Sequence, residues 1–156
     1  MRELELRRHA RRDPKADRLS AQGRAQAEDA GRASEGTYAM VFVSPAARAA
    51  ETAAWFLRGT GQQLPEHAVI PGLAGQGAGG GTPEAMAAGV RALLGRLPDG
   101  GRGLAISHTP LVEAAALGLG GVEVAPMAEL EGILVSQDED GTLSVAELRR
   151  DAAASE

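Results

Sequence analysis

Two histidines and two arginines stand at points of the sequence where chemistry could occur. Arg8 and His9 end an alternating segment near the start of the chain. Arg48 lies one turn into a helical segment that follows an apolar run, and His108 directly follows another such run. A guanidinium binds oxyanions through two parallel hydrogen bonds, and a neutral imidazole can attack phosphorus. If the fold brings these side chains together, they would form a pocket for a phosphoryl group.

The segments that must position these residues alternate between strands and helices. Periodicity and turn residues predict strands at 3–8, 39–43, 68–71 and 102–107, helices at 20–34, 46–57, 82–97 and 109–118, and a hairpin at 130–136 and 142–148. Repeated strand–helix units imply a mostly parallel sheet. We therefore expect an α/β fold, a three-layer sandwich with helices on both faces of the sheet and a C-terminal β-hairpin.

Such a fold would place the four residues at one edge, because ligands bind beyond the carboxyl ends of parallel strands. Ser20 is a good helix N-cap, and proline follows a capping residue at Ser44, Thr82 and Thr109. The helices that start after Ser44 and Thr109 would point free N–H groups at the same edge. We expect a strongly positive site.

Two segments are less regular. Glu3, Glu5 and Arg7 share one face of the first strand, which predicts that this face is partly exposed to water. The glycine-rich stretch Gly72–Gly81 matches no phosphate-binding motif, and we interpret it as a mobile loop.

Composition restricts the class of protein. The 156 residues fit a single domain over 1–150, with 151–156 as a frayed tail. The absence of cysteine excludes disulfides and a cysteine nucleophile. No apolar run approaches the roughly 20 residues of a membrane-spanning helix, and no signal peptide precedes the charged start. We expect a cytoplasmic protein that does not act at membranes.

Charge favours a small anionic ligand. The net charge is −5, although the first 32 residues hold eight arginines and one lysine. An acidic protein lacks the extended basic surface that nucleic-acid binding requires, so we expect no nucleic-acid partner. A locally positive segment in such a protein suits one phosphate better than a long polyanion.

Four segments in order resemble the histidine phosphatase superfamily. They are LRRHA at 6–10, LSAQGRAQA at 19–27, VFVSPAARAAET at 41–52 and LAISHTPLV at 104–112. The resemblance runs from Glu3 to about Leu148, and the short length is most similar to the small bacterial phosphohistidine phosphatases.

The resemblance implies a role for each of the four residues. His9 would be the nucleophile that takes the phosphoryl group, and Arg8 and Arg48 would hold its oxygens. His108 would be the second histidine that binds the phosphoryl group and steadies the transition state. The resemblance implies a covalent phosphohistidine that water then hydrolyses, with no metal and no cofactor. The partner would be a phosphorylated protein or a small phosphorylated metabolite.

The sequence departs from the family pattern at two positions. The glycine of the signature is Ala10, a small change that a negative φ tolerates. The glutamate that many members use as proton donor is replaced by glycine or glutamine in PGLAGQG, and Glu84 is the nearest candidate for that role. A missing acid favours phosphohistidine substrates, whose leaving group needs less protonation than an alkoxide does.

Two other functions remain open: a phosphate-binding relative without useful turnover, and a nucleic-acid-binding module that uses the basic start. For the other arginines of the first 32 residues we expect solvated surface positions, although Arg11 could line the pocket mouth. His67 is predicted to be a surface residue, and Ser44 and Ser107 to be cap or turn residues rather than nucleophiles.

Overall fold

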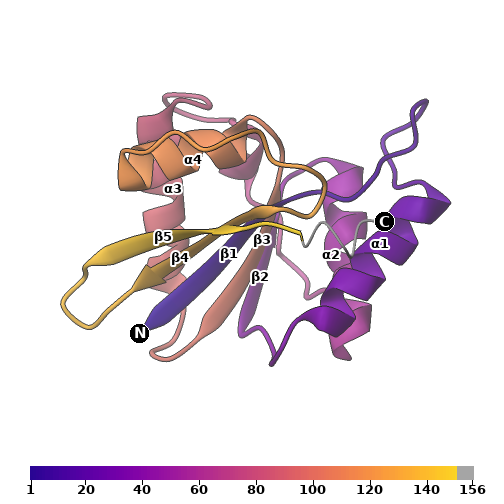
Figure 1. The fold of residues 1–156 in the computed structure, drawn as a ribbon, viewed down its shortest axis with the longest axis horizontal. Coiled ribbons are helices and arrows are strands. Elements are labelled where there is room, and N and C mark those ends of the chain that lie inside the picture. Colours follow the sequence, from indigo (N-terminus) through magenta and orange to yellow (C-terminus); the bar gives the residue numbers. More distant parts are fainter. Residues whose placement is uncertain (151–156) are drawn as a thin grey trace.

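Five strands form one mixed sheet in the order β2-β3-β1-β4-β5 (Figure 1). The computed structural model describes residues 1–150, and the tail expected at 151–156 lies outside the described residues. Three neighbouring strands are parallel and end at the same edge of the sheet: β1 (Arg2–Arg8), β2 (Met40–Val43) and β3 (Arg102–Ser107). The hairpin of β4 (Gly132–Gln137) and β5 (Leu143–Leu148) adds to β1 in the antiparallel direction.

Helices cover both faces of the sheet (Figure 1). One pair packs on one face and consists of α1 (Ala21–Ala33) and α2 (Ala47–Thr60). The other pair packs on the opposite face and consists of α3 (Pro83–Arg96) and α4 (Leu111–Gly120). A separate hydrophobic core fills each interlayer space. The predicted three-layer α/β fold with its C-terminal hairpin is confirmed, and no helix within residues 1–150 is long and apolar enough to cross a membrane.

The two helix pairs pack closely because glycine stands where each pair meets. A Cβ atom on Gly31 of α1 would overlap the carbonyl oxygen of Phe56 in α2. A Cβ atom on Gly118 of α4 would likewise overlap the carbonyl oxygen of Pro83 at the start of α3. Backbone-to-backbone contact of this kind fits a chain with few aromatic residues, because small side chains must supply the packing density.

The first strand does not have the exposed face that its charged residues predict. Glu5 is only 2 % exposed, and its carboxylate accepts hydrogen bonds from Arg7 and Arg102. The hydroxyl of Tyr38 lies 3.0 Å from both of its oxygens. A buried carboxylate is stable only when it is paired and hydrogen-bonded, and here a neighbouring strand supplies the second arginine. The expectation of a wet face was wrong at Glu5.

Helix starts follow the capping signals in part. Ser20 caps α1 through the N–H of Gly23, and Thr82 caps α3 through the N–H of Ala85, as predicted. The helix expected from Ser44 instead starts at Ala47, and its cap position, Ala46, has no side-chain hydrogen bond. A residue far away in the sequence caps this helix, as described below.

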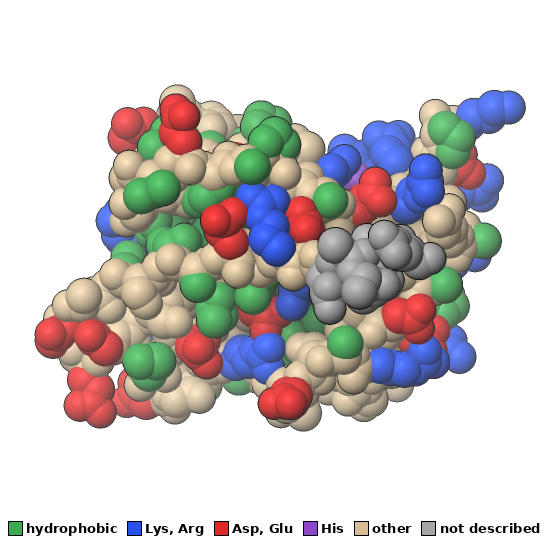
Figure 2. Space-filling model, viewed as in Figure 1, with side chains coloured by type: hydrophobic (Ala, Val, Ile, Leu, Met, Phe, Trp, Pro, Cys, Tyr) green, Lys and Arg blue, Asp and Glu red, His purple; other side chains and the backbone are tan. Residues whose placement is uncertain are grey.

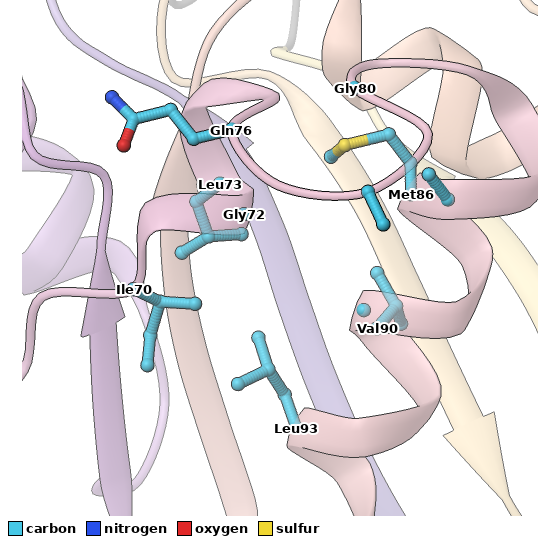
Figure 3. A pocket seen from close by; sticks show the side chains of 11 residues that line it. Ile70, Gly72, Leu73, Gln76, Gly80, Met86, Val90 and Leu93 are labelled. Carbon is cyan, nitrogen blue, oxygen red and sulfur yellow. The ribbon is translucent and has the colours of Figure 1, made fainter.

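The predicted strand at 68–71 is reduced to one bridge between Val43 and Val69. Pro71 has no N–H to extend a ladder, and the chain turns at that point into the short 3₁₀ helix η1 (Pro71–Ala74). The glycine-rich stretch continues as successive turns that pack beside α3. Between it and α3 lies a mainly apolar cavity of about 60 Å³ (Figure 3).

Candidate active site

Three chain segments meet beyond the ends of the parallel strands. Arg8 is the register partner of Ser107, and the N–H of His9 donates to the Ser107 carbonyl oxygen at 3.1 Å. The N–H of Ser44 donates to the carbonyl oxygen of Ile106 at 3.0 Å. The first residue after each of the three parallel strands therefore lies at the same edge of the sheet. These residues are His9, Ser44 and His108, and they are neighbours there.

His9 is buried at 7 % exposure, and its ring is oriented by the main chain. The Nδ1 atom lies 2.7 Å from the Ala10 carbonyl oxygen, which can only accept, so Nδ1 carries a proton. In the neutral ring the lone pair is then on Nε2. Burial lowers the pKa of His9 most, the charges of Arg48, Arg8 and Arg12 lower it further, and the Ala10 hydrogen bond opposes them. His9 thus presents a neutral nucleophilic Nε2 near neutral pH.

Arg48 connects the two histidines from the first turn of α2. Its Nε donates to His9 Nε2 at 3.3 Å, and its NH2 lies 3.4 Å from His108 Nδ1. The two rings meet edge to face, with centroids 5.3 Å apart. One guanidinium therefore contacts the ring atoms of both histidines that face each other across the site.

His108 is partly exposed and is held from behind by Ser44. The Ser44 Oγ lies 2.5 Å from His108 Nε2 and also accepts the N–H of Ala46 at 3.2 Å. Because a guanidinium can only donate, Nδ1 is an acceptor toward Arg48, and the proton of the neutral ring lies on Nε2. Burial and the positive charge of Arg48 lower the pKa of His108 to about 4, against a weak opposite effect of Asp17.

Arg8 lies on the other side of the β1 end from Arg7. Its NH1 donates to the Met127 carbonyl oxygen at 2.8 Å, and its Nε has no hydrogen-bond partner within residues 1–150. Arg7 turns away, pairs with Glu5 and lies over the Phe56 ring. Arg8 therefore keeps donors for a ligand, whereas the donors of Arg7 are engaged in the interior.

The sequence interpretation missed Asp17, an essential part of the arrangement. Its carboxylate accepts the N–H of Ala47 at 2.8 Å and that of Arg48 at 3.0 Å, and it pairs with the Arg48 guanidinium at 2.9 Å. Asp17 thus caps α2 from a different loop and fixes the position of Arg48. The hydrogen bonds from Ala47 and Arg48 and the charge of Arg48 together lower the pKa of Asp17 to about 2, against the opposing effect of partial desolvation.

Thr52 joins the loop after β1 to α2. Its buried hydroxyl accepts the N–H of Ala10 at 3.0 Å and donates to the Arg48 carbonyl oxygen at 2.8 Å. Ser44 does not cap the helix as predicted, and its hydroxyl instead fixes the ring of His108. The sequence holds a signal for both residues, since each lies in the quoted segment 41–52, but their partners are distant in the chain.

Glu84 stands apart from these contacts. It lies exposed in the first turn of α3, and its side chain makes no hydrogen bond or ion pair with another residue of 1–150. The cavity of Figure 3 is also separate, because none of the residues that line it is an arginine or a histidine. Within the described part of the chain, no group of three or more potential metal ligands is close enough to hold an ion.

The site is cationic, contains two histidines with lowered pKa, and offers donors from two arginines. Such a site can hold a dianionic tetrahedral group and present a neutral nitrogen to its central atom. Arg48 and His9 are already in contact, so the guanidinium and the nucleophilic nitrogen would bind adjacent atoms of that group.

Comparison with known proteins agrees with this geometry. The model of the histidine phosphatase superfamily (branch 1) matches residues 3–79, a segment that contains His9 and Arg48 but ends before His108. No curated protein matches the chain.

Solved structures share the fold over almost the whole chain. The protein histidine phosphatase SixA in complex with tungstate is 23 % identical, with a TM-score of 0.72 over 94 % of this chain and 96 % of that one. Phosphoserine phosphatase from Entamoeba histolytica is 15 % identical, with a TM-score of 0.76 over 97 % and 98 %. A mycobacterial glucosyl-3-phosphoglycerate phosphatase is 18 % identical, with a TM-score of 0.71 over 96 % and 99 %. Over residues 3–79 the chain thus matches the model of the histidine phosphatase superfamily, and over almost its whole length it shares the fold of these solved phosphatases.

Proposed function

We propose that the protein is a phosphatase that transfers a phosphoryl group from its substrate to His9 and then to water. The observation that carries the proposal is the contact of one guanidinium, Arg48, with the facing nitrogens of His9 and His108. The tautomer of His9 adds support, because its lone pair lies on the nitrogen that faces Arg48. The solved phosphatases of the same fold support the same class of reaction.

The reaction has two steps at one position. The Nε2 atom of His9 attacks phosphorus, the bond from phosphorus to the leaving group breaks, and Arg8 and Arg48 bind the phosphoryl oxygens. Water then attacks the phosphorus of phospho-His9, the P–N bond breaks, and inorganic phosphate leaves. A bound dianion favours protonation of His108, which would then donate through Nδ1 to a phosphoryl oxygen. No step needs a metal ion.

We further propose phosphohistidine on a protein, or a small phosphomonoester, as the substrate, with phosphohistidine favoured. The carboxylate inside the site, Asp17, has a pKa of about 2 and cannot donate a proton near neutral pH. The side chain of Glu84 forms no hydrogen bond or ion pair with a residue of the site, and its role as proton donor stays a prediction. An imidazole leaving group depends less on an acid than an alkoxide does. The solved structure of the protein histidine phosphatase SixA agrees with this preference.

The lack of an acid that contacts the site and can donate a proton also supports a second candidate, a phosphate-binding relative with little turnover. Both candidates use the same anion site, so only turnover separates them.

The test compares wild-type protein with His9→Ala on a phosphohistidine peptide and on an aryl phosphate, with and without a metal chelator. We expect phosphate release from the peptide that survives the chelator and is lost in His9→Ala, together with an acid-labile ³²P label on the wild-type chain only. Phosphate binding without turnover on either substrate would favour the binding protein. Turnover that persists in His9→Ala would refute the assignment of the nucleophile.

A further inference from the structure

One carboxylate beside the site has no part in the proposed chemistry. Basic side chains gather around a histidine at the corner of the molecule where the parallel strands end (Figure 2). Asp17 balances one of these cations, because it pairs with the guanidinium of Arg48. Glu113 is half-buried in the first turn of α4, the helix that follows His108, and its carboxylate contacts the main chain instead.

The carboxylate of Glu113 uses only one of its oxygens. The Oε2 atom accepts the hydroxyl of Thr109, which directly follows His108, and the N–H of Met127 at 3.2 Å. The Oε1 atom is buried and has no hydrogen-bond partner within residues 1–150. A buried carboxylate oxygen without a partner costs free energy, so stability alone does not account for a glutamate at this position.

Met127 lies between Glu113 and Arg8 and contacts both through its main chain. Its N–H donates to Glu113, and its carbonyl oxygen accepts NH1 of Arg8 at 2.8 Å. Its side chain is buried in a hydrophobic core. Residues 122–128 form no helix or strand, so the side chains that bind this loop set the position of the Met127 carbonyl oxygen.

The two arginines of the site are held in different ways. Arg48 pairs with a carboxylate, at 2.9 Å from Asp17. Arg8 pairs with no carboxylate within residues 1–150, and its guanidinium donates to the Met127 carbonyl oxygen. A carbonyl oxygen orients a guanidinium without neutralising it, so Arg8 keeps its full charge for an oxyanion.

We propose that Glu113 is a positioning residue for Arg8. Its carboxylate fixes the main chain of Met127, which in turn fixes the guanidinium that binds the phosphoryl group. The inference rests on the proposed function for the role of Arg8, and it adds a residue that acts through Arg8 rather than on the substrate. Both hydrogen bonds of Glu113 end on Oε2, so the role needs an acceptor oxygen at this position and no negative charge.

The test measures the binding of inorganic phosphate by calorimetry and needs no turnover. Urea unfolding first shows that each variant is folded. We expect Glu113→Ala to bind phosphate about five-fold more weakly, which is part of the loss expected for a charged hydrogen bond. Glu113→Gln keeps the acceptor oxygen and should bind phosphate as wild-type protein does. Wild-type affinity in Glu113→Ala, or equal losses in both variants, would overturn the proposal.

A double variant shows whether Glu113 acts through Arg8. Arg8→Gln removes the guanidinium, and the same phosphate titration is then repeated with Glu113→Ala added to it. If Glu113 acts only through Arg8, the double variant binds phosphate as weakly as Arg8→Gln alone. A further loss of the size seen in the single variant would place the effect elsewhere and count against the proposal.

Arg149 provides a control for general loosening of the loop. Its guanidinium donates to the carbonyl oxygens of Ala125 at 2.8 Å and Pro126 at 3.2 Å, and it makes no contact with Met127. We expect Arg149→Gln to keep the wild-type affinity for phosphate, and a loss equal to that of Glu113→Ala would contradict a specific role of Glu113. A wild-type protein that binds phosphate but hydrolyses neither test substrate would refute the proposed reaction and leave this inference intact.

Discussion

Acid should destabilise the protein through His108 over a defined pH window. The pKa of the ring is about 4 in the folded chain and 6.5 when unperturbed. The unfolded chain therefore binds this proton first as pH falls, so stability is present above pH 6.5 and is lost progressively down to about pH 4.

The structure gives the size of the loss. With these two pKa values, the free energy of unfolding falls by about 2.5 kcal/mol between roughly pH 7.5 and roughly pH 4.5. The ring is only partly buried, and solvent screening reduces this loss to roughly 1 to 2 kcal/mol. His108→Gln removes the titrating group and keeps an amide that can donate to Ser44 in place of Nε2.

The assay is urea unfolding of wild-type protein and His108→Gln at both pH values. For each protein, the free energy of unfolding at the lower pH is subtracted from that at the higher pH. The difference between the two proteins in this quantity is the contribution of His108, because the carboxylates titrate in both. Exposed His67, changed to Gln, controls for the loss of a histidine and should keep the wild-type pH dependence. An equal loss of stability in wild-type protein and His108→Gln would refute the reasoning.

Two further substitutions test the residues that hold the site together. Asp17→Asn weakens the cap of α2 and removes the ion pair that holds the Arg48 guanidinium. We expect urea unfolding to show a stability lower by about 1 kcal/mol, and enzyme assays to show a higher KM for phosphohistidine peptide. An unchanged KM would contradict the role of Asp17 in positioning Arg48. Ser44→Ala leaves His108 Nε2 without its hydrogen-bond partner, so we expect a loss of about 1 to 3 kcal/mol of stability and a shifted pH profile of kcat. The control is Ser107→Ala, which removes a buried hydroxyl that donates to the Leu73 carbonyl oxygen. This control should keep the wild-type pH profile of kcat.

The edge at which the site lies could be predicted from the sequence. The apolar runs before Ser44 and His108 identify buried strands, and parallel strands bring their ends together whatever the details of packing. Contacts between distant segments could not be predicted. Asp17 caps a helix that starts 30 residues later, at Ala47, and no local pattern encodes that pairing.

The same physical reason explains the errors. Alternation along the first strand suggested water near Glu5, but Arg102 on β3 compensates its charge. Capping chemistry suggested a helix from Ser44, but the hydroxyl of Ser44 bonds to His108 and Asp17 caps the helix instead. In each case a side chain satisfied its polar atoms with a partner that only the folded chain brings near.

The glycine contact between α1 and α2 has a consequence for how this protein tolerates sequence change. Because Gly31 lets the two backbones touch, the distance between α1 and α2 is set by main-chain atoms, and Arg48 belongs to α2. A methyl group at Gly31 would displace the arginine without altering any residue of the site. In a screen of random variants for loss of activity, Gly31 should therefore be found among the sensitive positions together with His9 and His108, although it contacts neither histidine.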